Sequence, residues 1–190
     1  MVHLITERLI IRDYLNDDSS ALHNLLSQKE VMRFLPETYC ESKYESKENL
    51  RIAIEESHRK ARRKYFFAIV DKHSKKYIGS IGFEMISPEI TNGVGELGYF
   101  LEKRYWRKGI AIEAAKAVID YAFSVVRLNK IVVNCMKTNH ASLKLIEKLK
   151  FLKETESPKP IRHENKMVAF VAYGMLNKEW KKKYIPKTQF

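Results

Sequence analysis

Residues 106–111 of this 190-residue chain read WRKGIA and join two strongly patterned segments. Residues 95–101, GELGYFL, have the composition of a strand, and residues 112–126 carry apolar side chains at helical spacing. A turn from a strand into a helix directs unpaired backbone N–H groups and the positive end of the helix dipole at one place. Arg107 and Lys108 add charge there, and Gly109 lets the main chain approach a ligand closely. The stretch suits a pyrophosphate, although a basic turn with one glycine is also a common plain connection.

Working outward from this turn, strand and helix patterns alternate along the rest of the chain. Strands are expected at residues 6–14, 65–70, 77–85, 95–101, 131–136 and 168–176. Helices are expected after the capping cluster at 16–19 and at residues 31–35, 43–64, 112–126 and 141–149. This order predicts an α/β fold of the α+β type, with helices flanking a mixed central sheet. We expect one domain at residues 1–178 and a short basic tail at residues 179–190.

The composition limits the classes of protein to which the chain can belong. The formal charge is +12, from 35 Lys and Arg against 23 Asp and Glu, which favours anionic partners or simply gives a solvated basic surface. Charged residues begin too early for a signal peptide, and no apolar run approaches the roughly 20 residues that span a membrane, so we expect a cytoplasmic protein. Cys40 and Cys135 are far apart, which predicts free thiols and no metal site.

Four segments, in order along the chain, resemble the GNAT acetyltransferases and, more narrowly, their RimJ/RimL-like branch. WRKGIA is similar to the family's acyl-CoA loop, Gln/Arg-x-x-Gly-x-Gly/Ala, with Trp106 at the Gln/Arg position and Arg107 where Gly is usual. Residues 6–12, TERLIIR, resemble the branch's opening strand, and GELGYFL resembles its central one. Residues 139–151 resemble its Asn-x-x-Ser helix, with Lys150 in place of the usual Gly. A left-handed helix end at Lys150 would cost roughly 1 kcal/mol.

The resemblance implies a GNAT fold with a splayed central strand and acetyl-CoA as co-substrate. It assigns the pyrophosphate to the loop formed by Trp106, Arg107, Lys108, Gly109, Ile110 and Ala111. It assigns the pantetheine arm to the main chain of Tyr99, Phe100 and Leu101, whose side chains can also be ordinary core residues. Asn139 is implied to contact the cofactor arm, but an Asn at this position is also a good helix cap.

Amide formation needs a group that takes a proton from the amine and a donor for the departing thiolate. Glu96 is the first candidate for the base, because it lies on the expected central strand with the same parity as Gly98 and Phe100. Glu84, on the neighbouring hairpin, is the second candidate, and each glutamate could instead be a solvated or salt-bridged surface residue. The resemblance places the Ser142 hydroxyl near the cofactor sulfur, although Ser142 could be a plain first-turn residue.

The predicted activity is acetyl transfer from acetyl-CoA to a primary amine by direct attack in a ternary complex. A ribosomal-protein N-terminal amine and a small-molecule amine, such as an antibiotic or polyamine, both remain open as acceptors. A rival from another class is a non-catalytic basic module that binds RNA or the ribosome, through residues 58–64 or 181–183, although such charge runs are usually just solvated. We expect no membrane partner and a monomer or homodimer.

Overall fold

The computed structural model describes residues 1–87, 89, 92–156, 161–163 and 166–184. The chain forms two compact units. The first consists of residues 1–84 and 98–118, and the second of residues 85–97 and 119–190. Strand β5 (Val94–Leu101) and helix α4 (Ile110–Ser124) each continue from one unit into the other.

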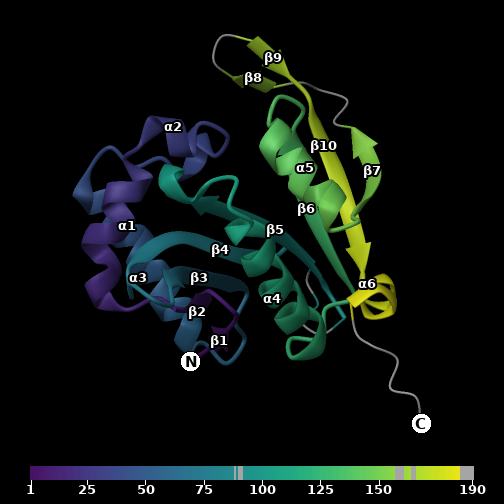
Figure 1. Cartoon of the computed structure of the whole chain (residues 1–190), viewed down its shortest axis with the longest axis horizontal. Helices are drawn as coiled ribbons and strands as arrows, with labels where there is room; N and C mark the ends of the chain where they lie inside the picture. The colour runs from purple at the N-terminus through teal and green to yellow at the C-terminus, as the bar shows by residue number, and fades with distance from the viewer. Residues whose placement is uncertain (88, 90–91, 157–160, 164–165, 185–190) are drawn as a thin grey trace. The chain divides into compact units, whose positions relative to one another are not determined.

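Antiparallel strands that are neighbours in chain order form the sheet of the first unit (Figure 1). They are β1 (His3–Ile5), β2 (Leu9–Asp13), β3 (Lys64–Asp71) and β4 (Tyr77–Met85). The single strand expected at residues 6–14 was therefore wrong, because β1 and β2 form a hairpin. The N–H of Thr6 donates to the carbonyl of Leu9 at 3.0 Å and closes the turn. Alternation within β2 is as expected, with Leu9 and Ile11 fully buried.

Two short helices and one long helix cover part of this sheet: α1 (Ser19–Leu26), α2 (Lys29–Met32) and α3 (Lys43–His58). The first unit also contains single 3₁₀ turns at Asn16–Asp18, Pro36–Thr38 and Lys103–Tyr105. The apolar side chains of α1, α2 and α3 pack with residues of β2 and β3 into one buried cluster. A capping box starts α3, since Glu45 N–H donates to Ser42 Oγ and Ser42 N–H donates to the Glu45 carboxylate.

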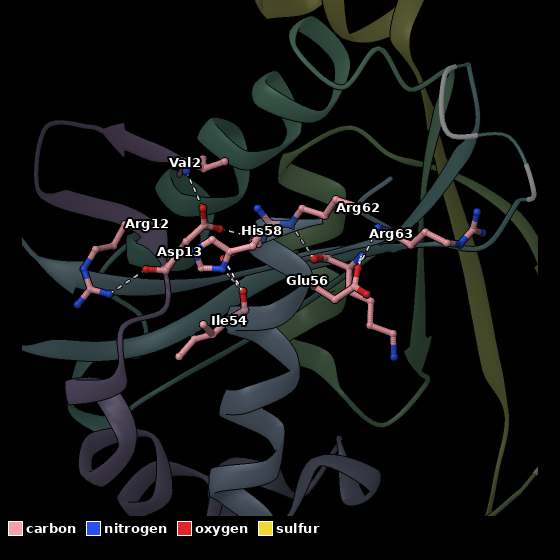
Figure 2. A network of polar contacts seen from close by, with 10 residues as sticks. Val2, Arg12, Asp13, Ile54, Glu56, His58, Arg62 and Arg63 are labelled. Atoms are coloured by element: carbon pink, nitrogen blue, oxygen red, sulfur yellow. Dashed lines mark hydrogen bonds and ion pairs between the residues drawn. The ribbon is translucent and has the colours of Figure 1, made fainter. Parts of the chain in front are cut away.

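Helix α3 ends at His58, six residues before the end predicted from the charge pattern. The Glu56 carboxylate explains this, because it accepts the N–H groups of Arg63 and Lys64 at 3.0 Å each and turns the chain back into β3 (Figure 2). Those bonds, together with the Arg59 and Lys64 cations, outweigh the effect of burial and hold the pKa of Glu56 below its ordinary value. Local helical periodicity could not reveal this carboxylate's partners.

Arg62 lies inside the first unit, although the sequence places it in a run of basic residues. Its side chain is 7% exposed and pairs with the buried Asp13 at 2.8 Å. Asp13 also accepts the N–H of Val2 at 2.6 Å (Figure 2). The Arg62 guanidinium lies over the ring of Tyr65, 4.6 Å from the centroid. The run at residues 58–64 is therefore not a continuous basic surface, and Arg62 is not accessible to RNA.

The second unit has its own strand order, β5, β6 (Lys130–Met136), β10 (Phe170–Leu176) and β7 (Leu152–Glu156) (Figure 1). The pairing of β5 with β6 is parallel and that of β6 with β10 is antiparallel, so the sheet is mixed as predicted. The sequence analysis did not identify β7, the small pair β8 (Ile161–His163) and β9 (Lys166–Val168), or helix α6 (Asn177–Tyr184). The charged residues of β7 carry no alternating pattern.

Helix α6 contains all of the described residues that were expected to form a basic tail. Trp180 is 2% exposed, its ring lies 6.3 Å from that of Phe123, and its indole N–H donates to Asp120 at 3.3 Å. The Lys residues of this helix are exposed. The predicted domain limit at residue 178 falls inside α6 and stays a prediction.

Helix α5 (His140–Lys148) is followed by a left-handed residue, Lys150, at the position where the sequence analysis noted Lys in place of the usual Gly. Lys150 has φ +63°, its N–H donates to the Glu147 carbonyl at 2.9 Å, and the Phe151 N–H donates to the Ile146 carbonyl at 3.2 Å. These two bonds form a Schellman motif, in which glycine is the usual residue at this position. Lysine therefore carries the conformational strain.

Candidate active site

The loop at residues 106–111 has the properties of an anion site in the first unit. Gly109 has φ +77°, and a Cβ placed on it would meet only Nη2 of Arg8, at 3.4 Å. Arg107 is also left-handed, at φ +59°, which explains why glycine is usual there. The first backbone bond of α4 runs from Glu113 N–H to the Gly109 carbonyl, at 3.1 Å. Within the described part of the chain, the N–H groups of residues 110–112 have no backbone acceptor and remain available.

Trp106 holds this loop against the end of β5. Its indole N–H donates to the Leu101 carbonyl at 2.7 Å, while the side chain remains 38% exposed. That bond occupies the Leu101 carbonyl, one of the main-chain groups that the resemblance assigned to the pantetheine arm. Phe100 packs against the buried cluster of the first unit through its side chain.

A clamp from the β1–β2 turn fixes the same loop, and the sequence analysis missed it. The Arg8 guanidinium donates to Glu113 at 2.6 Å and to the Lys108 carbonyl at 2.9 Å. The Glu113 carboxylate also accepts the Arg8 N–H at 2.9 Å and the Thr6 hydroxyl at 2.5 Å. Arg8 was noted only as part of the TERLIIR strand, because contacts between residues 100 or more positions apart leave no local sequence signal.

The Glu113 carboxylate is charged in this clamp. Burial alone would raise its pKa, but the hydrogen bonds from Thr6 and Arg8 and the Arg8 charge outweigh burial and lower the pKa below its ordinary value. A carboxylate in the first turn of α4 also interacts favourably with the helix dipole. The clamp therefore holds the shape of the loop while leaving its N–H groups free.

Glu96 lies in the second unit, at the last β5 position that pairs with β6 (Glu96 with Val132). Among the described residues, no β5 position beyond Glu96 pairs with β6, which is the arrangement that a splayed strand requires. The Asn134 side-chain amide donates to Glu96 Oε1 at 2.9 Å. Two strand residues further along β5, a Cβ placed on Gly98 would meet no atom within 4 Å. The face of β5 that carries Glu96 is thus open at Gly98.

Asn139 and Ser142 lie together at the start of α5. Asn139 is the N-cap, and its side-chain oxygen accepts the Ser142 N–H at 3.2 Å. The Ser142 side chain is buried and hydrogen-bonds with the Cys135 thiol on β6. Burial raises the pKa of Cys135, and the bond with Ser142 opposes this only in part. Cys135 is therefore a protonated thiol at neutral pH.

Glu84 belongs to a cross-strand ion pair of the first unit. Its carboxylate lies 3.5 Å from Lys64 Nζ, and the two residues are opposite each other in the β3–β4 register. The Glu84 side chain is 47% exposed. This is the salt-bridged surface position that the sequence analysis kept as the alternative for Glu84.

Comparison with known proteins decides the family. The acetyltransferase (GNAT) domain model matches residues 8–152, which is most of the chain. The chain belongs to the GNAT acetyltransferase family. It is 30% identical to the N-acetyltransferase p20 of Bacillus licheniformis over 181 residues, 95% of this chain and 99% of that protein. It is 27% identical to the ribosomal protein uS5-alanine N-acetyltransferase of Escherichia coli over 160 residues, 80% of this chain and 79% of that protein.

The fold agrees with a solved structure of the same family. The spermidine N-acetyltransferase of Vibrio cholerae, in complex with CoA and spermine, matches with a TM-score of 0.79 at 20% identity, over 92% of this chain and 99% of that one. This GNAT enzyme is therefore an acetyl-CoA-dependent N-acetyltransferase with a RimJ-like relation, as the sequence predicted. The residues around Gly109 fit the co-substrate, because they combine an open turn, free N–H groups and exposed cations.

No group of three or more His, Cys, Asp or Glu side chains in the described part of the chain could hold a metal ion. Across the same residues, no helix is both long and apolar enough to cross a membrane.

Proposed function

We propose that this GNAT enzyme acetylates the N-terminal α-amine of a protein, with ribosomal proteins as the candidate class, by direct attack in a ternary complex. The support for a protein acceptor is the relative that acts on a ribosomal protein, which aligns with four-fifths of the chain. A GNAT fold alone does not choose between acceptors, because the same fold also serves a spermidine acetyltransferase.

The observation that carries the catalytic assignment is the Glu96 carboxylate, hydrogen-bonded to Asn134 beside an open stretch of β5. An α-amine must lose a proton to attack a carbonyl carbon, and a carboxylate at that position would accept it directly or through one water. The Asn134 amide orients Glu96 and leaves its second oxygen for the proton. Glu84, which is paired with Lys64, is the second candidate.

Acetyl-CoA supplies the acetyl group as a thioester, whose C–S bond breaks as the new C–N bond forms. Ser142 would donate its hydroxyl proton to the departing sulfur, after its side chain turns from Cys135. The Asn139 cap holds the first turn of α5, and so the position of Ser142, in place. In this step Glu96 gains a proton from the amine and Ser142 loses one to the sulfur. The enzyme returns to its starting state when Glu96 releases its proton to solvent and Ser142 takes one up.

The Cys135 thiol supports direct transfer over a route through a protein thioester. Cys135, on β6, hydrogen-bonds with Ser142 in the first turn of α5, but its raised pKa leaves it protonated and poorly reactive. In the first unit, we assign the pyrophosphate to the N–H groups of residues 109–111 with Arg107 and Lys108. The pantetheine arm is assigned to the main chain at Tyr99 and Phe100 and, through its N–H, at Leu101.

A thiol-release assay tests the proposed acceptor. The enzyme and acetyl-CoA are offered peptides that carry a free α-amine, the same peptides with a blocked N-terminus, and polyamines at equal concentration. We expect release with the free peptides, and mass spectrometry should place one acetyl group on the α-nitrogen. Release with polyamines alone would replace the protein acceptor by a small amine. Absence of acetyl-CoA binding would instead favour a non-catalytic basic module.

A further inference from the structure

A group of exposed lysines in the second unit takes no part in the proposed acetyl transfer. They lie in the last turns of α5 and α6 and at the left-handed position that follows α5. The group consists of Lys148, Lys150, Lys181, Lys182 and Lys183, and is called the lysine surface. Within the described part of the chain, no carboxylate forms an ion pair with these lysines.

Two hydrogen bonds hold the ends of α5 and α6 side by side. Lys183 Nζ donates to the Lys150 carbonyl at 3.2 Å, and the Tyr184 hydroxyl donates to the Leu149 carbonyl at 3.2 Å. The Lys183 ammonium group keeps two further donors after this bond. The cations at the two helix ends are therefore brought together in one region of the surface.

Lys150 is the member of the lysine surface that folding does not explain. The other lysines interact favourably with the negative ends of two helix dipoles. Lys150 has φ +63°, which glycine adopts without strain, and its backbone bonds would be the same with glycine. Among the described residues, it is the Lys150 carbonyl and not its side chain that has a partner in α6. A strained residue with an exposed cation points to a ligand outside the chain.

The carboxylates that are near in sequence do not neutralise the lysine surface. Glu154 and Glu156, on β7, each pair with lysines that are not part of it. Glu179 accepts the Leu176 N–H at 3.0 Å, at the start of its own helix. The lysine surface therefore retains its positive charge and favours a polyanion.

An open pocket of about 370 Å³ adjoins the lysine surface, because Phe151, directly after Lys150, is one of its lining residues. The pocket is formed by α5, β7 and β10, and its walls include the ring of Tyr173 and the apolar side chains of Leu143 and Leu152. Its volume is in the range of small-molecule sites. Aromatic and apolar groups therefore lie next to a row of cations.

The charged groups of this pocket nearly cancel. Lys144 and Glu147 have opposite charges, and Lys153 is paired with Glu156. His140 adds an imidazole that can donate or accept a hydrogen bond. A nearly neutral pocket with aromatic walls suits an uncharged planar heterocycle better than a phosphate.

An anionic membrane fits this surface less well than a nucleic acid does. A helix that lies on a membrane buries an exposed apolar face in it. The apolar residues of α6 are instead used inside the unit, since Trp180 is 2% exposed and the Tyr184 ring lies 4.1 Å from it. Cations beside an aromatic pocket match a single-stranded nucleic acid, whose bases are free to leave the stack.

We propose that the second unit binds single-stranded RNA, with the phosphates on the lysine surface and one unpaired base in the pocket beside Tyr173. Phosphate contacts supply most of the affinity, and the base adds a contact that carries no charge. The choice of RNA over DNA rests on the proposed ribosomal-protein acceptor, whose surroundings in a ribosome are RNA. This contact uses none of the residues assigned to acetyl transfer and brings the enzyme to its acceptor.

Fluorescence anisotropy of a labelled single-stranded RNA, measured between about 50 and 200 mM salt, tests the phosphate contacts. Lys181→Ala/Lys182→Ala should weaken binding about tenfold and reduce the salt slope by about 1.4, because each phosphate contact to a single strand contributes about 0.7. Lys43→Ala/Lys47→Ala, which removes two exposed lysines from α3, is the matched control. It loses the same charge and should keep the slope of the wild type.

Lys150→Gly removes one cation while keeping the left-handed backbone. It should reduce the salt slope by about 0.7 without any loss of thermal stability, because glycine adopts this conformation freely. A weaker complex in a variant that is at least as stable as the wild type cannot come from unfolding. An unchanged slope and affinity in Lys150→Gly would remove Lys150 from the surface and overturn the functional explanation of its strain.

Tyr173 provides the arm that tests the base. Tyr173→Leu should weaken RNA binding about fivefold or more with an unchanged salt slope, whereas Tyr173→Phe should retain the affinity, because the ring alone contacts the base. Circular dichroism should show that each variant is folded. Inorganic polyphosphate, which has no bases, should compete less well than unlabelled RNA.

Several results would overturn this proposal. They are absence of saturable RNA binding by the wild type, wild-type affinity and slope in folded Lys181→Ala/Lys182→Ala, and polyphosphate that competes as well as RNA. Tighter binding to DNA of the same sequence, or to vesicles of anionic phospholipid, would assign the surface to that partner instead. The binding assays contain no acetyl-CoA, so each of these results leaves the proposed acetyl transfer standing. Failure to acetylate peptides, with RNA binding intact, would count against the proposed acceptor alone.

Discussion

At the scale of single residues, Glu96 is the residue on which the catalytic assignment depends. Glu96→Gln removes the proton acceptor and nearly keeps the shape, so turnover at neutral pH should fall about a hundredfold or more while acetyl-CoA affinity is unchanged. The defect should shrink as the pH rises toward the pKa of the acceptor amine, because an already neutral amine needs no base. Turnover against pH, measured for both proteins, checks this. Wild-type turnover at neutral pH in the mutant would move the role to Glu84 or to water.

Gly98 tests whether a ligand lies against the open face of β5. A Cβ there meets nothing within 4 Å, so Gly98→Val should fold and should keep the thermal stability of the wild type within a few degrees. If the acetyl end of the co-substrate lies beside Gly98, the added methyl groups should lower acetyl-CoA affinity at least tenfold. Calorimetric titration provides the affinity, and thermal denaturation provides the control. An unchanged affinity would show that this face is not used.

The sequence indicated that Lys150 stands where glycine is usual, and the structure shows that Lys150 carries conformational strain there. It has φ +63° at the end of α5, a conformation that glycine adopts freely. Lys150→Gly should therefore stabilise the protein by about 1 kcal/mol, or roughly 2–4 °C in Tm for a chain of this size. Thermal denaturation measures it, with Lys144→Gly, at an exposed position in the middle of α5, as a control that should destabilise. A lower Tm for Lys150→Gly would mean that its side chain makes a compensating contact.

At the scale of elements, the β1–β2 turn and the first turn of α4 act together through Glu113. Glu113→Gln should lower the free energy of unfolding by about 1–2 kcal/mol and weaken acetyl-CoA binding, because it removes the charge that holds Arg8 against the loop. Since the folded pKa of Glu113 is lowered, its stabilising effect is full above the ordinary glutamate pKa of about 4.3 and is lost as the pH falls through the folded value.

The stability difference between wild type and Glu113→Gln should therefore be largest near neutral pH and shrink below about pH 4. Urea unfolding at several pH values measures it. Glu7→Gln, on the same turn but outside the clamp, is the matched control and should show little difference at any pH. A difference that stays constant down to pH 2 would show that the Glu113 charge does not carry the stabilisation.

Sequence periodicity predicted best those elements whose own apolar residues follow a regular strand or helix spacing. Strand β4 matches the prediction at both ends, and α4, β6 and α5 match within two residues. The failures have specific causes. A carboxylate, Glu56, ends α3 through bonds to Arg63 and Lys64, and the Thr6–Leu9 bond makes a hairpin out of one apparent strand. Neither partner lies at a spacing that local patterns detect.

The candidate site was predictable only as far as its residues lie in contiguous motifs. The loop around Gly109, the Asn139 cap and Ser142 were all predicted from short stretches, and their roles in the site stay predictions. Arg8, Glu113 and Asn134 were not, because each acts through a partner on another element. The resemblance identified the family, and the structure adds the residues that hold the family's loop and the proposed base in position.

At the scale of the whole molecule, the net charge of +12 favours encounter with an anionic co-substrate and should make its binding sensitive to salt. Not all of this charge is available at the surface, since Arg62 is buried against Asp13 and Arg8 is held by Glu113. The two compact units are each stabilised by their own packing, with the apolar cluster under α1–α3 in the first and Trp180 against Phe123 in the second.

The central claim is that the turn at Gly109 binds the phosphates of acetyl-CoA, and calorimetric titration of acetyl-CoA into the wild type and Gly109→Glu tests it most directly. The new side chain would place bulk and negative charge in a space that now contains only Arg8 Nη2, at 3.4 Å. We predict saturable one-site binding by the wild type and no detectable binding by the mutant, with unchanged circular dichroism. No heat from the wild type at millimolar acetyl-CoA, or normal affinity in the folded mutant, would contradict the account.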